Sequence, residues 1–159
     1  MNIFVTNPDP IESAFALDDK RVIKMALESA QIMATTINLF GGQAPYKTTH
    51  KNHPCSVWAR QNRSNYWWLF QHYQGLCQAY YDRFGKRHKT MDHMSDWSNG
   101  TFLLPKGELT EFANCTDFKD LPVLEAYTLQ LRKKWASDKR KPKWTNTSSP
   151  EWSGVSNET

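Results

Sequence analysis

The strongest constraint on the fold is a run of apolar residues at helical spacing between positions 19 and 40. The run reads DKRVIKMALESAQIMATTINLF and is followed by Gly41 and Gly42. Apolar residues recur in it at steps of three and four, which places them on one face of an α-helix. The two glycines then favour the end of that helix. The residues predicted to face the core are Ile23, Ala26, Leu27, Ala30, Met33, Ala34 and Ile37.

Three further segments are predicted to be helical. Asp9 and Pro10 are a favourable cap and first residue for a short helix over 10–17. A long helix is predicted over 54–84, and a third over 121–139. Residues 86–119 are rich in Ser, Asn, Gly and Thr, which predicts irregular structure. We therefore expect an all-α, compact single domain over 1–145, with an irregular aromatic tail over 146–159 that is partly disordered.

Composition narrows the class of protein. The 159 residues include seven Trp and 13% aromatic residues, while the mean hydropathy is −0.71. The sequence contains no apolar stretch typical of a membrane span or a secretory signal, which predicts a cytoplasmic protein (host cytoplasm if phage-encoded) without membrane association. A monomer is favoured. Cys55, Cys77 and Cys115 are odd in number and widely spaced, which favours reduced thiols.

A polar ridge is predicted on the face of the 19–40 helix that lies opposite the apolar one. Glu28 is its only acid, and its other members are Arg21, Lys24, Gln31 and Thr35. A carboxylate among cations and amides is a candidate catalytic group. The alternative is an ordinary surface pair of Lys24 with Glu28, which contributes about 0.3–0.5 kcal/mol.

Basic residues are concentrated in three segments although the net charge is only +4. Residues 47–63 hold four Lys or Arg and no acid, 83–89 hold another four and no acid, and 132–143 hold seven with one acid. Basic segments interleaved with aromatic residues are typical of nucleic-acid binding, although solvated loops are the alternative. DNA is the expected partner, duplex rather than single-stranded. The candidate DNA contacts are Arg21, Lys47, His50, Lys51, His53, Arg60, Arg63, Lys86 and Arg87.

The loop YKTTHKNHPC at 46–55 allows three interpretations. It gathers cations and histidines before a helix N-terminus, which favours a bound phosphate. A zinc site at His50, His53 and Cys55 would need a fourth ligand from His88, His93 or Cys115, and this spacing matches no familiar zinc finger. In the third interpretation His53 only caps the helix. We favour the phosphate and expect neither a metal nor a cofactor.

The order of these segments resembles the bacteriophage endonuclease V or pyrimidine-dimer DNA glycosylase family. The resemblance covers roughly residues 1–90. It rests on the short apolar start MNIFV, on DDKRVIKMALE ending at Glu28, and on YKTTHKNHPCSVW followed by a helix that ends in YYDRFGKRH. The tail KPKWTNTSSPEW is also similar to the aromatic end of that family.

The resemblance implies an all-helical DNA glycosylase with amine chemistry. In that family the N-terminal amine attacks C1′ of an extruded nucleotide and forms a Schiff base, and a glutamate, here Glu28, stabilises the sugar cation. Elimination then cuts the strand. Asn2 is too large to favour removal of Met1, so the amine would be that of Met1, with Lys24 as a second candidate if it is buried. Leu27 stands where the family has an arginine.

Two other functions are compatible with the same residues. One is a transferase with a glycosylase fold that hypermodifies thymine derivatives in phage DNA. The other is a DNA-binding or inhibitory protein without catalysis, in which Glu28 is only part of a surface ion pair.

Overall fold

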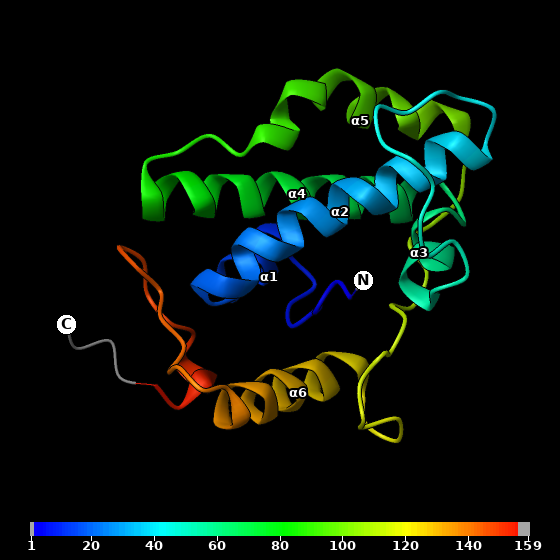
Figure 1. Cartoon of the computed structure of the whole chain (residues 1–159). Helices are drawn as coiled ribbons and strands as arrows, with labels where there is room; N and C mark the ends of the chain where they lie inside the picture. Colours follow the sequence, from blue (N-terminus) through cyan, green and yellow to red (C-terminus); the bar gives the residue numbers. More distant parts are fainter. Residues whose placement is uncertain (1, 156–159) are drawn as a thin grey trace.

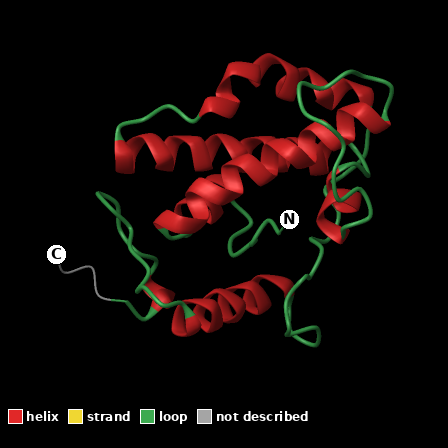
Figure 2. Cartoon of the chain, viewed as in Figure 1, coloured by secondary structure: helices red, strands yellow, loops and turns green. Residues whose placement is uncertain are grey.

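The computed structural model describes residues 2–155, and within them every regular element is helical (Figure 2). Short helix α1 (Pro10–Phe15) is followed by α2 (Asp19–Leu39), α3 (Pro54–Ala59) and α4 (Arg63–Phe84). After these come α5 (Met94–Gly100) and α6 (Val123–Ser137), with short 3-10 turns at Lys89–His93, Thr101–Leu103 and Glu151–Ser153. The prediction of an all-α fold is confirmed. None of the described helices is long and apolar enough to cross a membrane.

The core forms where α1 and α2 pack against α4 (Figure 1). Helix α1 begins where Asp9 accepts hydrogen bonds from the first two free amides, as predicted from the Asp-Pro pair. Gly75 allows α1 and α4 to approach closely, because a Cβ at this position would lie 2.9 Å from the Cβ of Ala14.

The N-terminal segment has no regular structure, with Phe4 in the left-handed region at φ 58°, and it lies between α6 and the α1–α2–α4 layer (Figure 1). Ile3, Phe4 and Val5 are each at most 4% exposed. The ring of Phe4 packs edge-on against Tyr127 of α6, with centroids 6.2 Å apart. Residues 3–5 are thus part of the core and hold α6 against the other helices.

The predicted apolar face of α2 is wrong at two positions. Ile23 and Leu27 are 45% and 43% exposed, whereas Arg21 and Thr35 from the predicted polar ridge are buried. Both polar residues have partners from distant segments. The Thr35 hydroxyl donates to Thr49 O and accepts from Thr49 N, at 3.1 and 3.0 Å. Polar groups that are hydrogen-bonded in this way can be buried at little cost.

The single helix predicted over 54–84 is instead two helices. Asn62 is extended, with φ −162°, and its side chain accepts from Asn65 N at 3.0 Å to start α4. Asn65 is fully buried and joins the two helices to a distant loop. Its Nδ2 donates to Trp58 O at 2.9 Å, and its Oδ1 accepts from Thr110 N at 2.9 Å.

Residues 86–119 are more regular than predicted, because they contain α5 and two 3-10 turns. Trp97 of α5 is fully buried and donates its Nε1–H to Thr90 O. The helix predicted over 121–139 spans Val123–Ser137.

The aromatic tail packs against α6 up to residue 155. Trp152 stacks on Trp135 with ring centroids 5.6 Å apart, and Trp144 meets Trp135 edge-on at 5.1 Å. Trp144 also donates to Ala16 O at 3.0 Å, which ties the tail to the end of α1. The part of the predicted tail over 156–159 lies outside the described residues.

Candidate functional site

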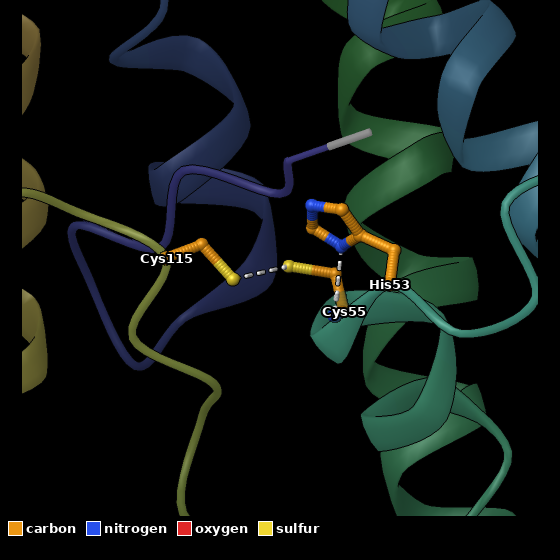
Figure 3. A group of neighbouring side chains, drawn as sticks. All are labelled: His53, Cys55 and Cys115. Carbon is orange, nitrogen blue, oxygen red and sulfur yellow. Dashed lines mark hydrogen bonds between the residues drawn. The ribbon is translucent and has the colours of Figure 1, made fainter.

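Four segments that are distant in sequence meet beside the N-terminal end of α3. They are the N-terminal segment, α2, α3 itself and the loop between the second 3-10 turn and α6. Figure 3 shows Cys115 of this loop facing Cys55 of α3, with the ring of His53 next to them. The two Sγ atoms lie 3.7 Å apart, and Cys55 Sγ lies 4.0 Å from Asn2 Oδ1. The site therefore depends on tertiary structure and not on one motif.

His53 holds its place as the cap of α3. Its backbone is extended, and its Nδ1 accepts the N–H of Cys55 at 3.1 Å, while Pro54 is the first helical residue. Burial is the main cause that lowers the pKa of His53. The Glu28 carboxylate acts in the opposite direction and raises this pKa. Helix α2, which carries Glu28, packs against α3, which His53 caps.

Glu28 is half-buried on α2, one turn after the exposed Lys24. Of its two neighbours in sequence, Leu27 is exposed and Ser29 is only 2% exposed. The carboxylate thus stands at the border between the core and the surface. Partial burial lowers the local dielectric constant, which strengthens the interaction of a carboxylate with a nearby positive charge.

The two thiols at the site are coupled to each other. The hydrogen bond from Cys55 lowers the pKa of the half-buried Cys115 thiol. The same bond, together with burial, raises the pKa of Cys55. Tyr127 of α6 fixes the backbone at Cys115, because its hydroxyl accepts from Cys115 N at 3.1 Å and donates to Ala113 O at 2.6 Å.

Four of the predicted DNA contacts surround α3. Lys47, His50 and Lys51 are exposed on the loop that precedes it, and Arg60 is half-buried at its C-terminal end. The Nη1 atom of Arg60 is buried without a hydrogen-bond partner among the described residues. Together with His53 these residues flank α3 on both sides along the chain, and we call them the α3 surface.

The other predicted DNA contacts are placed differently. Arg63 begins α4 and donates its Nε–H to Leu104 O at 2.9 Å, so part of its guanidinium is used to hold a loop. Lys86 and Arg87 are exposed beyond the opposite end of α4, which is 22 residues long, or about 33 Å at 1.5 Å per residue. Arg87 also forms an ion pair with Asp92.

Arg21 is the predicted DNA contact that the structure argues against. It is 7% exposed, and its Nη1 lies 3.2 Å from Asp18 Oδ2 and 3.0 Å from Asp138 Oδ2. Its charge is therefore already balanced by two carboxylates inside the protein. We leave Arg21 out of the proposed DNA interface.

The sequence predicted Glu28 and His53 as site residues, but it did not predict Asn2 or Tyr127. Asn2 offered no signal beyond its size, and no motif in the sequence includes Tyr127. Cys115 was predicted to be a reduced thiol and was one of three options for a fourth zinc ligand. The other two options, His88 and His93, are not part of the cluster of donor atoms. Met1, predicted to supply the amine, lies outside the described residues.

Comparison with known proteins agrees with the resemblance in the sequence. The model of the pyrimidine dimer DNA glycosylase family matches residues 1–93, which is more than half of the 159-residue chain. The chain belongs to this family. Membership supports a DNA glycosylase that acts on pyrimidine damage, with DNA as the substrate. No curated protein and no solved structure among those compared matches the chain.

Proposed function

We propose that this protein removes a damaged or modified pyrimidine from duplex DNA and then cuts the strand as an AP lyase, with Glu28 as the catalytic carboxylate. The observation that supports this most directly is that α2, which carries the half-buried Glu28, packs against α3, where Asn2 lies 4.0 Å from Cys55 Sγ. Residues 1–145 would act as one glycosylase domain.

The proposed chemistry needs an amine and a carboxylate of the protein that both reach the same deoxyribose. The amine attacks C1′ and forms a C–N bond as the bond to the base breaks, and the base leaves with that electron pair and a proton. The nitrogen lone pair then opens the sugar ring to give a protonated Schiff base, and the ring oxygen takes up a proton from solvent to become the 4′ hydroxyl. Loss of a proton from C2′ then breaks the C3′–O bond, and the 3′ phosphate leaves with that electron pair. A fixed carboxylate stabilises the positive charge that develops at the sugar.

Two amines are candidates for the attack. The α-amino group of Met1 is favoured because its neighbour in sequence, Asn2, lies at the site. Lys24 is exposed on α2, so it lacks the burial that would activate a lysine as a nucleophile.

DNA would lie on the α3 surface. The cations Lys47, Lys51 and Arg60 all favour phosphate. The target base of a duplex must leave the stack before its C1′ can be reached, which a site beside the basic surface permits. Lys86 and Arg87 are too far from α3 to touch the same phosphates, so in this proposal they contact the duplex further along.

Borohydride trapping tests the amine chemistry. The purified protein is incubated with duplexes that carry single defined pyrimidine lesions or modified pyrimidines, and sodium borohydride reduces any Schiff base to a stable adduct. We expect an adduct whose peptide map carries the sugar on Met1, and we expect Lys24→Gln to retain it. Absence of an adduct on substrates that lose their base would contradict the lyase step. An intact strand of altered mass would favour a transferase instead.

A further inference from the structure

The cluster of His53, Cys55 and Cys115 has the composition and the dimensions of a zinc site. One possible ligand atom from each residue lies within 4.8 Å of the others. Thiolate and imidazole are the ligands that zinc prefers in proteins, and three of them with one open position make a common coordination set. We propose that this protein binds one Zn²⁺ ion through His53, Cys55 and Cys115.

The distance between the two sulfurs agrees with coordination of one ion. Two sulfurs that each lie about 2.3 Å from a tetrahedral zinc ion are about 3.8 Å apart. The Sγ atoms of Cys55 and Cys115 lie 3.7 Å apart. A disulfide would need them at about 2.05 Å, so the present arrangement favours a shared ion over a covalent bond.

The residues around the cluster hold the ligands in place. Tyr127 holds the backbone at Cys115 N and at Ala113 O, and the backbone N–H of Cys55 is held by His53. Zinc sites are commonly supported in this way by hydrogen bonds outside the ligand set. His53 would give up the bond to Cys55 N if it coordinates through Nδ1, and would keep it only if it coordinates through Nε2. The fourth ligand would be a water molecule or Asn2 Oδ1, which lies 4.0 Å from Cys55 Sγ.

A zinc ion at this site would link the loop before α6 to α3. Cys115 lies in an irregular loop and Cys55 in α3, and the two are 60 residues apart in sequence. Cys115 also lies outside residues 1–93, the part of the chain that the family model matches. A shared ion would fasten the loop before α6 to the family-related part of the chain, next to the N-terminal segment.

Metal binding can be measured without reference to DNA. The full chain is reduced, freed of metal with a chelator, and titrated with Zn²⁺ in competition with a chromophoric chelator. We expect one Zn²⁺ per chain and a rise in the melting temperature on its addition, because a ligand that binds only the folded state stabilises it. Co²⁺ in place of Zn²⁺ should give the intense visible bands of tetrahedral coordination and a thiolate charge-transfer band.

Matched variants identify the ligands. Cys115→Ser and His53→Asn should each weaken zinc binding by more than about 100-fold, since even the loss of groups outside the ligand set costs about 10–100-fold. Asn at position 53 remains a good helix cap, so α3 is retained. His50→Asn is the control and should bind zinc as the wild type does, because His50 is exposed and outside the cluster. Circular dichroism of the metal-free proteins verifies that all of them are folded.

Three results would overturn the proposal. The first is a reduced, folded wild-type protein that takes up no Zn²⁺. The second is wild-type zinc affinity in Cys115→Ser or in His53→Asn. The third is a purified protein whose mass is lower by two hydrogens and whose Cys55 and Cys115 resist alkylation, since that result would show a disulfide.

Discussion

Arg21 at the start of α2 and Asp138 at the end of α6 form an ion pair, with Nη1 and Oδ2 3.0 Å apart. The same nitrogen lies 3.2 Å from Asp18 Oδ2, and Asp18 also accepts from Trp135 Nε1 at 2.9 Å. The guanidinium therefore joins the two helices across 117 positions of sequence. In this family member the cation on the first turn of α2 has a structural role.

The Arg21 contacts predict a large loss of stability when the guanidinium is removed. Arg21→Gln leaves Asp18, which is 2% exposed, without its cation, and breaking a buried pair in this way costs about 3–5 kcal/mol. The free energy of unfolding in urea measures the effect. Lys20→Gln is the matched control, because Lys20 is 69% exposed and lies 4.0 Å from Asp138. A loss in Arg21→Gln no greater than that of the control would contradict the structural role.

His72 predicts a loss of stability in mild acid. Burial lowers its pKa to about 4, whereas carbonyl oxygens of the chain act in the opposite direction. The pKa of an unfolded histidine is about 6.5, so between about pH 6.5 and 4 the unfolded state binds more protons than the folded state. Stability should therefore fall as the pH falls through this window, by about 3 kcal/mol in total from His72.

The pH effect is measured as the unfolding free energy of the wild type and His72→Gln at several pH values. His53 and His88 also have lowered pKa values, so their contributions have the same sign and remain in both proteins. The difference between the two proteins isolates His72. Equal slopes between about pH 6.5 and 4.5 would show that the folded state accommodates the protonated ring.

The α3 surface predicts how DNA binding depends on salt. Each lysine that contacts a phosphate contributes about 0.9 to the slope of log affinity against log salt. Lys47→Gln combined with Lys51→Gln should weaken binding to a duplex and reduce the slope by about 2. Lys133→Gln is the control, because Lys133 lies on α6 and is paired with Asp117 at 2.9 Å. An unchanged slope in the double variant would place the DNA elsewhere on the protein.

Local sequence patterns predicted the long helix over 19–40 closely, since it spans Asp19–Leu39, but they misplaced its faces. Periodicity assigns polar residues to the surface. Arg21 and Thr35 are nevertheless buried, because they form hydrogen bonds with Asp138 and Thr49 of other segments. The break before α4 had a local signal, because Asn62 is a favourable helix cap. That signal was outweighed by the apolar spacing on both sides of it.

The sequence singled out two residues of the candidate site, Glu28 and His53, but not the other residues that lie there. Glu28 and the loop that contains His53 stand out in the sequence by their charge and by the Pro that follows. The approach of Cys115 and Asn2 depends on how the loop before α6 and the N-terminal segment cross the core. No pattern within one segment encodes such a crossing.

The most direct test of the proposed function is base release by Glu28→Gln under single-turnover conditions. The substrate is a duplex with one pyrimidine dimer or modified pyrimidine that the wild-type protein processes, and Glu125→Gln on α6 is the control at an exposed acid. We expect Glu28→Gln to bind the duplex normally and to release the base roughly 10²–10⁴-fold more slowly, as is usual when a catalytic carboxylate loses its charge. The control should match the wild type. Wild-type rates of base release in Glu28→Gln would contradict the assignment of Glu28 as the catalytic carboxylate.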